Sequence, residues 1–330
     1  EHPLRWEQHK TQYQIMAESA RGALDDAGLT IKDVNGLFTS GVGGMGIIAL
    51  AEHMNLNPDF LDSNSIGGSS FVSHTAHAAA AIAAGYCDVA LILYGSKWSS
   101  DRFAIGTGGA GSGDPPEQFE SCYGPTTVGD YALTAQRHMH EFGTTSEQLA
   151  EIAVTTRRHA SLNPHAKFRD MITVDDVLAS REVSSPLHLL DCCMISDGGG
   201  ALVVTSAERA RDLKKKPVYI MSAAEACSHT SAGMRDLTDA AAKQSGPKAM
   251  ERAGVKHADF DMAMIYDSFT ITVCVTLESL GFCEKGEGGS FVQNGRIGLG
   301  GELPINTDGG GLSYNHPGMR GIFLVIEAVK

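Results

Sequence analysis

Apolar residues recur along the first third of the chain with two alternating periods. Stretches with the helical spacing of three and four residues are separated by short, continuous apolar runs. The predicted helices span 7–28, 43–55 and 69–84, and the predicted strands span 34–39, 60–63 and 88–94. Strands that alternate with helices are typical of βαβ units. We therefore expect an α/β protein with a mostly parallel sheet.

The pattern changes between residues about 99 and 186. A stretch rich in glycine and proline, 106–116, precedes two polar helices at 128–142 and 146–162. We interpret this region as an insertion between strands of the sheet. The α/β pattern then resumes, and further strands are predicted at 201–205, 218–222 and 262–265.

A repeat divides the chain into two halves. The segment Ala23–Asn35, which joins a helix end to a strand start, recurs as Ala249–Asp261. A second motif, Asn64–Gly68, recurs in the same order as Asn306–Gly310. Two echoes in one order indicate a duplicated unit. We predict an N-terminal half at 1–213, which carries the insertion, and a C-terminal half at 214–330.

Composition narrows the classes of function. The 330 residues are 42% hydrophobic and 20% charged, which is ordinary for a globular protein. The net charge of −13 argues against non-specific nucleic-acid binding, which depends on neutralising phosphates. The seven cysteines include no CxxC pair, so reduced thiols in a cytoplasmic enzyme are expected. The longest apolar stretch, 76–95, contains His77, Gly85 and Asp88, so no membrane span is predicted.

Three segments carry candidate chemistry. Tyr266 follows the apolar strand 262–265, and ligands of open α/β sheets sit at the carboxyl ends of strands. Tyr314 and His316 follow a glycine turn at a helix entrance, and both can move protons. Gly68 and Ser69 open a helix, where amides can bind an oxyanion or activate a nucleophile.

Other motifs have simpler interpretations. Gly41–Gly46 and Gly106–Gly111 fit G-x-G-x-x-G, but a chain with 38 glycines produces such matches by chance. His74 and His77 lie three residues apart without an acidic or cysteine pattern, which favours packed or interface histidines over a metal site. Adjacent Cys192 and Cys193 are expected to be buried structural residues.

Six segments, taken in order, resemble the thiolase superfamily. The resemblance is closest to the sterol-carrier-protein-x thiolases and the lipid-transfer-protein-type steroid aldolases. The segments are Asn64–Phe71, Ala80–Ala90, Leu190–Gly198, Tyr266–Phe269, Leu280–Gly289 and Asn315–Pro317. The resemblance implies the thiolase fold: two duplicated βαβ halves in five αβαβα layers, with a loop domain inserted in the first half at about 99–186.

The sequence departs from the family at the nucleophile. Family thiolases place a catalytic cysteine at the N-terminus of the helix that begins near Ser69, and here Gly68 holds that position. The strand-end motif, usually His-Asp or Asn-Glu, begins here with Tyr266. These departures resemble the aldolase branch, which cleaves a carbon–carbon bond of a β-hydroxyacyl-CoA without a covalent intermediate.

The resemblance implies a role for each site residue. Tyr266 and Tyr314 would transfer protons, and His316 would hydrogen-bond the thioester oxygen. The residues expected to polarise or bind the substrate are Gly68, Ser69, Asp267, Ser268 and Asn315. No metal and no cofactor are implied, since the CoA thioester is itself the substrate.

Two other functions stay open from the sequence. One is an acetyl-CoA acetyltransferase or 3-ketoacyl-CoA thiolase that uses another nucleophile, such as Ser69 or a cysteine beyond Lys330. The other is a non-catalytic subunit that binds acyl-CoA. The family implies a homodimer in lipid metabolism, as in steroid degradation, and its aldolase branch implies a small zinc-ribbon/OB-fold partner. The pattern places Lys330 inside the last helix, so we expect the natural chain to be longer at both ends.

Overall fold

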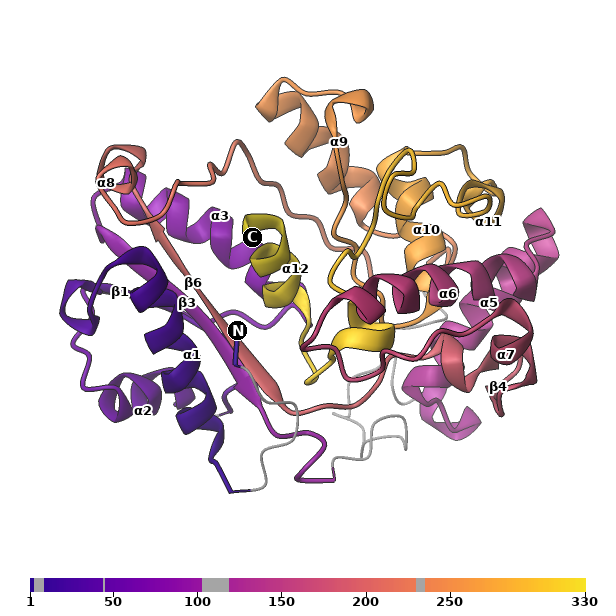
Figure 1. The fold of residues 1–330 in the computed structure, drawn as a ribbon, viewed down its shortest axis with the longest axis horizontal. Coiled ribbons are helices and arrows are strands. Elements are labelled where there is room, and N and C mark those ends of the chain that lie inside the picture. Colours follow the sequence, from indigo (N-terminus) through magenta and orange to yellow (C-terminus); the bar gives the residue numbers. More distant parts are fainter. Residues whose placement is uncertain (3–8, 44, 103–118, 230–234) are drawn as a thin grey trace. The chain divides into compact units, whose positions relative to one another are not determined.

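Two compact units make up the part of the chain that the computed structural model describes: residues 1–2, 9–43, 45–102, 119–229 and 235–330 (Figure 1). Unit 1 comprises Glu1–Arg102, Ile195–Ala224 and Asn315–Lys330, and unit 2 comprises Phe103–Met194 and Glu225–Tyr314. The units do not follow the two halves inferred from the repeat, because the last segment of the chain joins unit 1. The half boundary at 213/214 stays a prediction.

Unit 1 contains the main sheet and the helices that cover it. Its elements are α1 (Gln12–Ala27), η1 (Ile31–Asp33), β1 (Gly36–Phe38), α2 (Gly46–His53), β2 (Phe60–Asp62), α3 (Ser70–Ala83), β3 (Val89–Ser96), β6 (Gly198–Thr205), α8 (Ala207–Arg211) and α12 (Gly321–Val329). The predicted helices and strands of the first third are therefore confirmed, with ends that differ by a few residues.

The sheet has the strand order β2-β1-β3-β6. Strands β2, β1 and β3 pair in parallel, as the βαβ pattern predicts. Strand β6 pairs antiparallel with β3 over eight residues, from Val89 opposite Thr205 to Ser96 opposite Gly198. The sheet is thus mostly parallel with one antiparallel edge strand.

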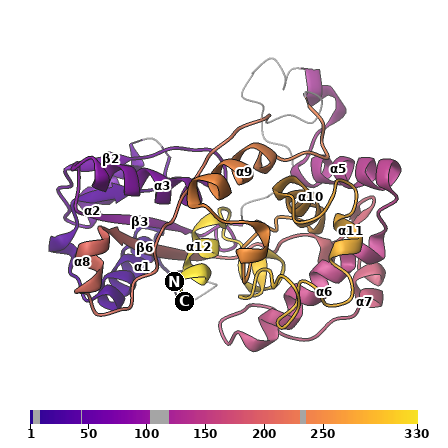
Figure 2. The same cartoon turned by 90° about the horizontal axis from the view of Figure 1, so that it is seen from above.

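Helices cover both faces of this sheet, and alternate residues of each strand point to opposite sides. Leu37 and Leu91 pack with α1 and α2, whereas Phe38 and Ile92 pack with α3 and α12. Figure 2 shows β3 and β6 side by side with α1 and α3 on opposite faces. Every residue of β3 is buried, which explains its continuous apolar sequence.

Glycine lets α1 approach the antiparallel edge of the sheet closely. A Cβ at Gly199 in β6 would lie 2.7 Å from Ile15 Cγ2 and 2.7 Å from the Tyr94 carbonyl oxygen. Real Cβ atoms do not come so close to other heavy atoms. The glycine run before residue 201 therefore serves packing of the sheet.

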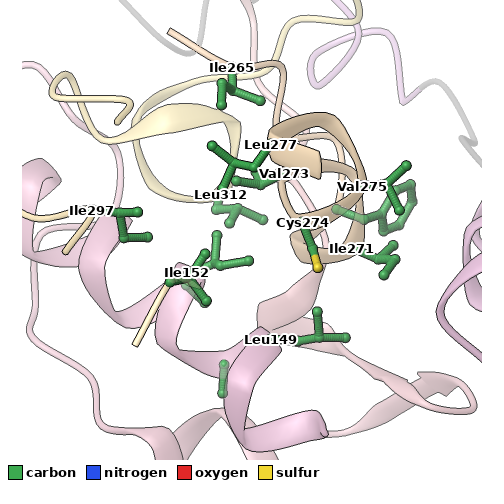
Figure 3. Packing of buried hydrophobic residues seen from close by; sticks show 14 of the residues in the cluster. Leu149, Ile152, Ile265, Ile271, Val273, Cys274, Val275, Leu277, Ile297 and Leu312 are labelled. Atoms are coloured by element: carbon green, nitrogen blue, oxygen red, sulfur yellow. The ribbon is translucent and has the colours of Figure 1, made fainter. Parts of the chain in front are cut away.

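Unit 2 is built mainly of helices around an apolar core. Its elements are η2 (Ser121–Tyr123), α5 (Thr127–Phe142), α6 (Ser146–Leu162), α7 (Val174–Ala179), β4 (Glu182–Ser184), β5 (Leu187–His188), η3 (Leu189–Asp191), α9 (Ala242–Ala253), η4 (His257–Asp259), α10 (Thr270–Leu280), α11 (Gly288–Phe291) and the π-helical turn η5 (Gly310–Tyr314). Figure 3 shows Leu149 and Ile152 of α6 in one cluster with Cys274 of α10 and Leu312 of η5.

The repeat is visible as the same local structure in both copies. Gly28 and Gly254 end α1 and α9 in left-handed conformations, with φ of 76° and 69°. Asp33 and Asp259 each accept, through Oδ2, the amide three residues earlier, at 2.9 and 2.7 Å. The shared Gly stop and 3₁₀ turn explain why the two sequences match.

The strand predicted at 218–222 is wrong. Residues 218–221 have no regular secondary structure, and their side chains are largely exposed, from 44% for Ile220 to 68% for Met221. No described strand pairs with this segment, so it has no ladder of hydrogen bonds. The strand predicted at 262–265 is reduced to one parallel bridge between Ala263 and Ile305. The Gly/Pro-rich stretch 106–116 lies outside the described residues.

Among the described residues, no helix combines the length and the apolar character that crossing a membrane requires.

Candidate active site

Tyr266 lies in unit 2 where the chain leaves the short bridge between Ala263 and Ile305. The amide of Ile265 donates to Asn306 Oδ1 at 2.9 Å, which fixes the backbone just before the tyrosine. Helix α10 begins four residues after Tyr266. Tyr266 is half-buried, whereas its neighbours on both sides are buried, so part of this side chain is open to solvent.

Asp267 is fully buried and faces the π-helical turn η5. Its Oδ1 accepts the amide of Gly311 at 2.8 Å, and its Oδ2 accepts the amide of Leu312 at 3.2 Å. Two backbone donors stabilise the carboxylate in this buried position. The predicted contact of Asp267 with substrate stays a prediction.

Ser268 points inward at the start of α10. The residue is 8% exposed, and its Oγ lies 3.0 Å from Thr272 Oγ1 one turn along the helix. Its carbonyl oxygen accepts the amide of Cys193 at 2.9 Å. The two sequence motifs around Cys193 and Ser268 therefore lie side by side in unit 2.

Tyr314 ends the π-helical turn and is fully buried, packed with Ala160 and Ala166. The amide of Tyr314 donates to the Gly309 carbonyl at 3.0 Å. Gly309 and Gly310 have φ of 103° and 63°, which side chains disfavour. The glycine pair of the second repeat motif thus permits the turn that carries Tyr314.

Neighbouring loops also hold this turn. Arg157 of α6 donates from Nε to Ser313 Oγ at 2.8 Å. The amides of Phe168 and Lys167 donate to the carbonyls of Ser313 and Tyr314 at 3.0 and 3.2 Å. Tyr314 therefore sits on a backbone that is fixed from several directions.

Asn315 and His316 belong to unit 1, directly after the turn. Buried Arg320 donates from Nη1 to Asn315 Oδ1 at 2.9 Å and to the Asn315 carbonyl at 3.1 Å. The amide of His316 donates to Ser196 Oγ at 3.0 Å, and the amide of Ser196 donates back to the His316 carbonyl at 3.3 Å. Tyr94 and Ser96 of β3 both donate to the Pro317 carbonyl. The sheet and its edge loop thus fix the backbone around His316.

The electrostatic surroundings of His316 keep its ring neutral. Burial, together with the positive charge of Arg320, lowers the pKa of His316 from 6.5 to about 4. A neutral imidazole can donate one hydrogen bond without carrying charge. This is the protonation state suited to polarising a thioester oxygen at neutral pH.

Gly68 and Ser69 precede α3 in unit 1. Ser70 makes two hydroxyl contacts at this helix start: its Oγ accepts the Ile66 amide at 3.0 Å and donates to the Gly67 carbonyl at 2.8 Å. Ser69 is exposed, and its Oγ contacts the Ile66 carbonyl at 3.4 Å. The carbonyl of Gly68 accepts the amide of Gly321 at 2.9 Å, which joins the starts of α3 and α12.

Sequence reasoning missed three residues that hold the site. Arg157, Ser196 and Arg320 each contact a site residue or its direct neighbour. Arg320 had a local signal, because it lies five residues after Asn315 in the same turn. Arg157 had none, because 156 positions separate it from Ser313.

One cluster in the described part of the chain has the side chains for a metal: His138, Cys274 and Glu278, whose ligand atoms lie within 4.8 Å of one another. The side chains of this cluster belong to a buried hydrogen-bond network. His138 Nε2 lies 3.0 Å from Glu278 Oε1, and the Gly288 amide donates to the same oxygen at 2.8 Å. Lys285 Nζ lies 3.7 Å from Glu278 Oε2, where its charge opposes a bound cation. These hydrogen bonds lower the pKa of Glu278 although its burial acts to raise it.

The remaining motifs serve packing. His74 is fully buried between the rings of Phe38 and Phe71, and His77 Nδ1 lies 2.6 Å from Asp62 Oδ2. Gly41, in the first G-x-G-x-x-G match, faces the side chains of Tyr94 and Met319. The second match lies outside the described residues.

This chain belongs to the thiolase superfamily, in the branch of the sterol-carrier-protein-type thiolases and steroid side-chain-cleaving aldolases. Residues 224–330 match the model of the Thiolase C-terminal domain-like family. The chain is 38% identical to a 17-hydroxy-3-oxo-4-pregnene-20-carboxyl-CoA lyase of Mycobacterium tuberculosis, over 95% of this chain and 85% of that protein. It is 35% identical to a steroid side-chain-cleaving aldolase of Thermomonospora curvata, over 97% of this chain and 86% of that protein.

A solved structure shares the fold. The chain superimposes on the Ltp2-ChsH2(DUF35) aldolase with a TM-score of 0.88 and 34% identity, covering 97% of this chain and 84% of that one. The thiolase fold predicted from the sequence is therefore confirmed, although the described residues of the C-terminal half form only isolated bridges, Ala263 with Ile305 and Phe269 with Cys192.

Proposed function

We propose that this chain is an aldolase that cleaves a β-hydroxyacyl-CoA by a retro-aldol reaction. Gly68 supports the proposal. It lies at the start of α3, where thiolases that form an acyl-enzyme carry their nucleophilic cysteine, and glycine has no side chain to attack the substrate. The relatives named as a CoA lyase and a steroid side-chain-cleaving aldolase support the same reaction class. A sterol or other bulky β-hydroxyacyl group is the substrate class that these names suggest.

The reaction needs two proton transfers and no covalent enzyme intermediate. One tyrosine, Tyr266 or Tyr314, reacts as its phenolate and takes the proton of the β-hydroxyl group. The hydroxyl oxygen becomes a carbonyl as the Cα–Cβ bond breaks, and the electron pair of that bond goes to Cα as a thioester enolate. The other tyrosine protonates Cα. After turnover the proton taken from the hydroxyl group passes to this other tyrosine, which restores both groups. The products are a ketone or aldehyde and a shorter acyl-CoA.

His316 donates a hydrogen bond to the thioester oxygen as that oxygen gains charge. The neutral state of its buried ring suits this role, because a charged imidazolium would be costly in the same place. The residues that we assign to substrate contact or polarisation are Gly68, Ser69, Asp267, Ser268 and Asn315. No cofactor takes part in the proposed reaction.

The proposal extends to partners and location. The similar solved structure is an aldolase with a DUF35 component, which supports a small zinc-ribbon/OB-fold protein as a partner of this chain. A homodimer and a cytoplasmic location complete the proposal, in line with the family resemblance and with the reduced cysteines of the described residues.

Mass spectrometry of the CoA products tests the function. One incubation contains a branched β-hydroxyacyl-CoA without free CoA, and the other contains a β-ketoacyl-CoA with free CoA. We expect a ketone or aldehyde and a shorter acyl-CoA in the first incubation only. Both are repeated with a co-purified DUF35-type subunit.

Two outcomes would contradict the aldolase. A shortened acyl-CoA from the β-ketoacyl substrate alone would identify an acyltransferase thiolase, and a covalent acyl group found by peptide mapping would name its nucleophile. Binding of acyl-CoA without turnover in any incubation would identify a binding subunit.

A further inference from the structure

We propose that Asp267 is a positioning residue, which sets the distance between the two proton-transferring tyrosines. This inference rests on the proposed retro-aldol function, in which Tyr266 and Tyr314 act on one substrate. Asp267 follows Tyr266 directly, and its carboxylate binds the turn that carries Tyr314. The role is distinct from the substrate contact expected for this residue from the family resemblance.

The carboxylate joins two segments that are far apart in the sequence. Its two oxygens accept the amides of Gly311 and Leu312 at 2.8 and 3.2 Å, one amide for each oxygen. Leu312 lies two residues before Tyr314 in the same turn. Asp267 is 0% exposed, so water does not compete with the two amides for the carboxylate oxygens. A buried, charge-assisted pair of hydrogen bonds is stiff compared with a surface contact.

The turn is shaped to receive this carboxylate. A Cβ at Gly310 would overlap Asp267 Oδ2, so glycine leaves the room that the oxygen occupies. The positive φ of Gly309 and Gly310 turns the next two amides toward one acceptor. Gly310 itself donates its amide to Asp308 Oδ1 at 2.9 Å, which fixes the start of the turn independently.

The turn has other anchors besides Asp267. Arg157 holds Ser313 through its side chain, and the amide of Met194 donates to the Gly311 carbonyl at 3.0 Å. These contacts would keep the turn folded without Asp267. The specific loss would be the direct link between the Tyr266 segment and the turn, since Cys193 and Met194, whose amides bind the Ser268 and Gly311 carbonyls, join them only through a third segment. A misplacement of about 1 Å in a reacting group costs up to ~100-fold in rate.

The test compares Asp267→Asn with wild type in the aldolase assay. Asparagine keeps the shape, but it presents one NH₂ group to a backbone amide that needs an acceptor. We expect kcat to fall at least ~10-fold, with KM within ~3-fold of wild type. Ser313→Ala is the matched control, because it removes the Arg157 contact from the same turn and leaves the carboxylate link; it should retain most of kcat.

A double-mutant cycle separates positioning from a general structural role. If Asp267 acts through the tyrosines, Asp267→Asn should cost less than ~3-fold in the residual activity of Tyr314→Phe, although it costs at least ~10-fold in wild type. Equal costs in both backgrounds would overturn the proposal. A rise in KM of more than ~10-fold with unchanged kcat would also overturn it, in favour of substrate contact.

Folding and function have separate readouts. Thermal unfolding and near-UV circular dichroism check that Asp267→Asn is native; if it is not, the cycle is run with Asp267→Ser, which leaves no buried charge. A wild-type protein that cleaves no β-hydroxyacyl-CoA would contradict the proposed function. A wild-type aldolase whose Asp267 variants retain full kcat would contradict the positioning role alone.

Discussion

At the scale of single residues, the three side chains to which we assign the proton transfers and the thioester contact differ in their exposure. Tyr266 is half-buried, whereas Tyr314 and His316 are buried. Each lies on a backbone segment that is fixed by side-chain or amide contacts from a neighbouring element. Such fixed segments are what proton transfer requires, because the rate depends on the geometry of donor and acceptor.

Phenylalanine at either tyrosine removes the hydroxyl and keeps the ring. We expect Tyr266→Phe and Tyr314→Phe each to lower kcat at least ~100-fold, the usual size of general acid–base catalysis. Steady-state kinetics of β-hydroxyacyl-CoA cleavage measures the effect. A loss below ~10-fold for one variant would remove that tyrosine from the mechanism. Tyr86→Phe, at an exposed position on unit 1, is the control and should match wild type.

His316 makes stability depend on pH in a defined direction. Its pKa is lowered from 6.5 to about 4 in the folded protein, chiefly by burial, so the unfolded chain binds this proton more readily. The stabilisation is therefore complete above about pH 6.5 and is lost as the pH falls toward 4. The loss is on the order of 3 kcal/mol. Urea unfolding at pH 7 and pH 4.5 should show a smaller pH effect in His316→Gln than in wild type; equal effects would contradict the assignment.

At the scale of elements, the starts of helices α3 and α12 in unit 1 come into direct backbone contact. The start of α12 touches the start of α3 through the bond from the Gly321 amide to the Gly68 carbonyl. A Cβ at Gly321 would overlap that carbonyl oxygen. The two helix starts are therefore in direct contact, and only glycine permits it at Gly321.

Alanine at Gly321 should separate the two helix starts. We expect Gly321→Ala to lower the free energy of unfolding by about 1–3 kcal/mol, the usual cost of overpacking. Gly22→Ala is the control: Gly22 lies inside α1 with no atom within 4 Å of an added Cβ, so this variant should be more stable by about 0.5–1 kcal/mol. Urea denaturation measures both. A neutral Gly321→Ala would show that α12 moves freely against α3.

The contact between His138 and Glu278 joins α5 to α10. We expect Glu278→Gln to lower the free energy of unfolding by about 1–3 kcal/mol, because it alters the buried carboxylate that accepts the Gly288 amide and contacts the His138 ring. Glu141→Gln breaks a surface pair with Arg137 on the same α5 helix and should cost less than about 1 kcal/mol. A chelator should leave the thermal midpoint of the wild type unchanged; a fall would identify a bound metal at His138.

At the scale of the whole molecule, the sequence predicted what local pattern and propensity determine. The apolar run Val89–Ser96 and the helix Ser146–Leu162 follow from periodicity and from the Thr145 capping box. The strand at 218–222 could not be judged from its own apolar residues, because a strand forms only when a partner supplies the hydrogen bonds. Contacts such as Arg157 with Ser313 had no local signal at all.

The site was predictable as a set of segments but not as an arrangement. Strand-end and helix-start rules singled out Tyr266, Gly68 and the turn before His316. The π-helical form of residues 310–314 requires the positive φ of two glycines, and the carboxylate of Asp267 binds this turn to the Tyr266 segment. Such cooperation between distant residues arises only when the chain is folded.

The close packing of β6 against α1 has a consequence for how this gene can change. Every single-nucleotide substitution in a glycine codon that alters the amino acid introduces a residue with a Cβ. At Gly199 that atom would meet Ile15 and the Tyr94 carbonyl at 2.7 Å, and the carbonyl belongs to the backbone of β3. No one-step missense mutation at this codon is therefore compatible with the present sheet. When a library of random coding changes is selected for folded protein and sequenced, missense variants at position 199 should be among the first to disappear.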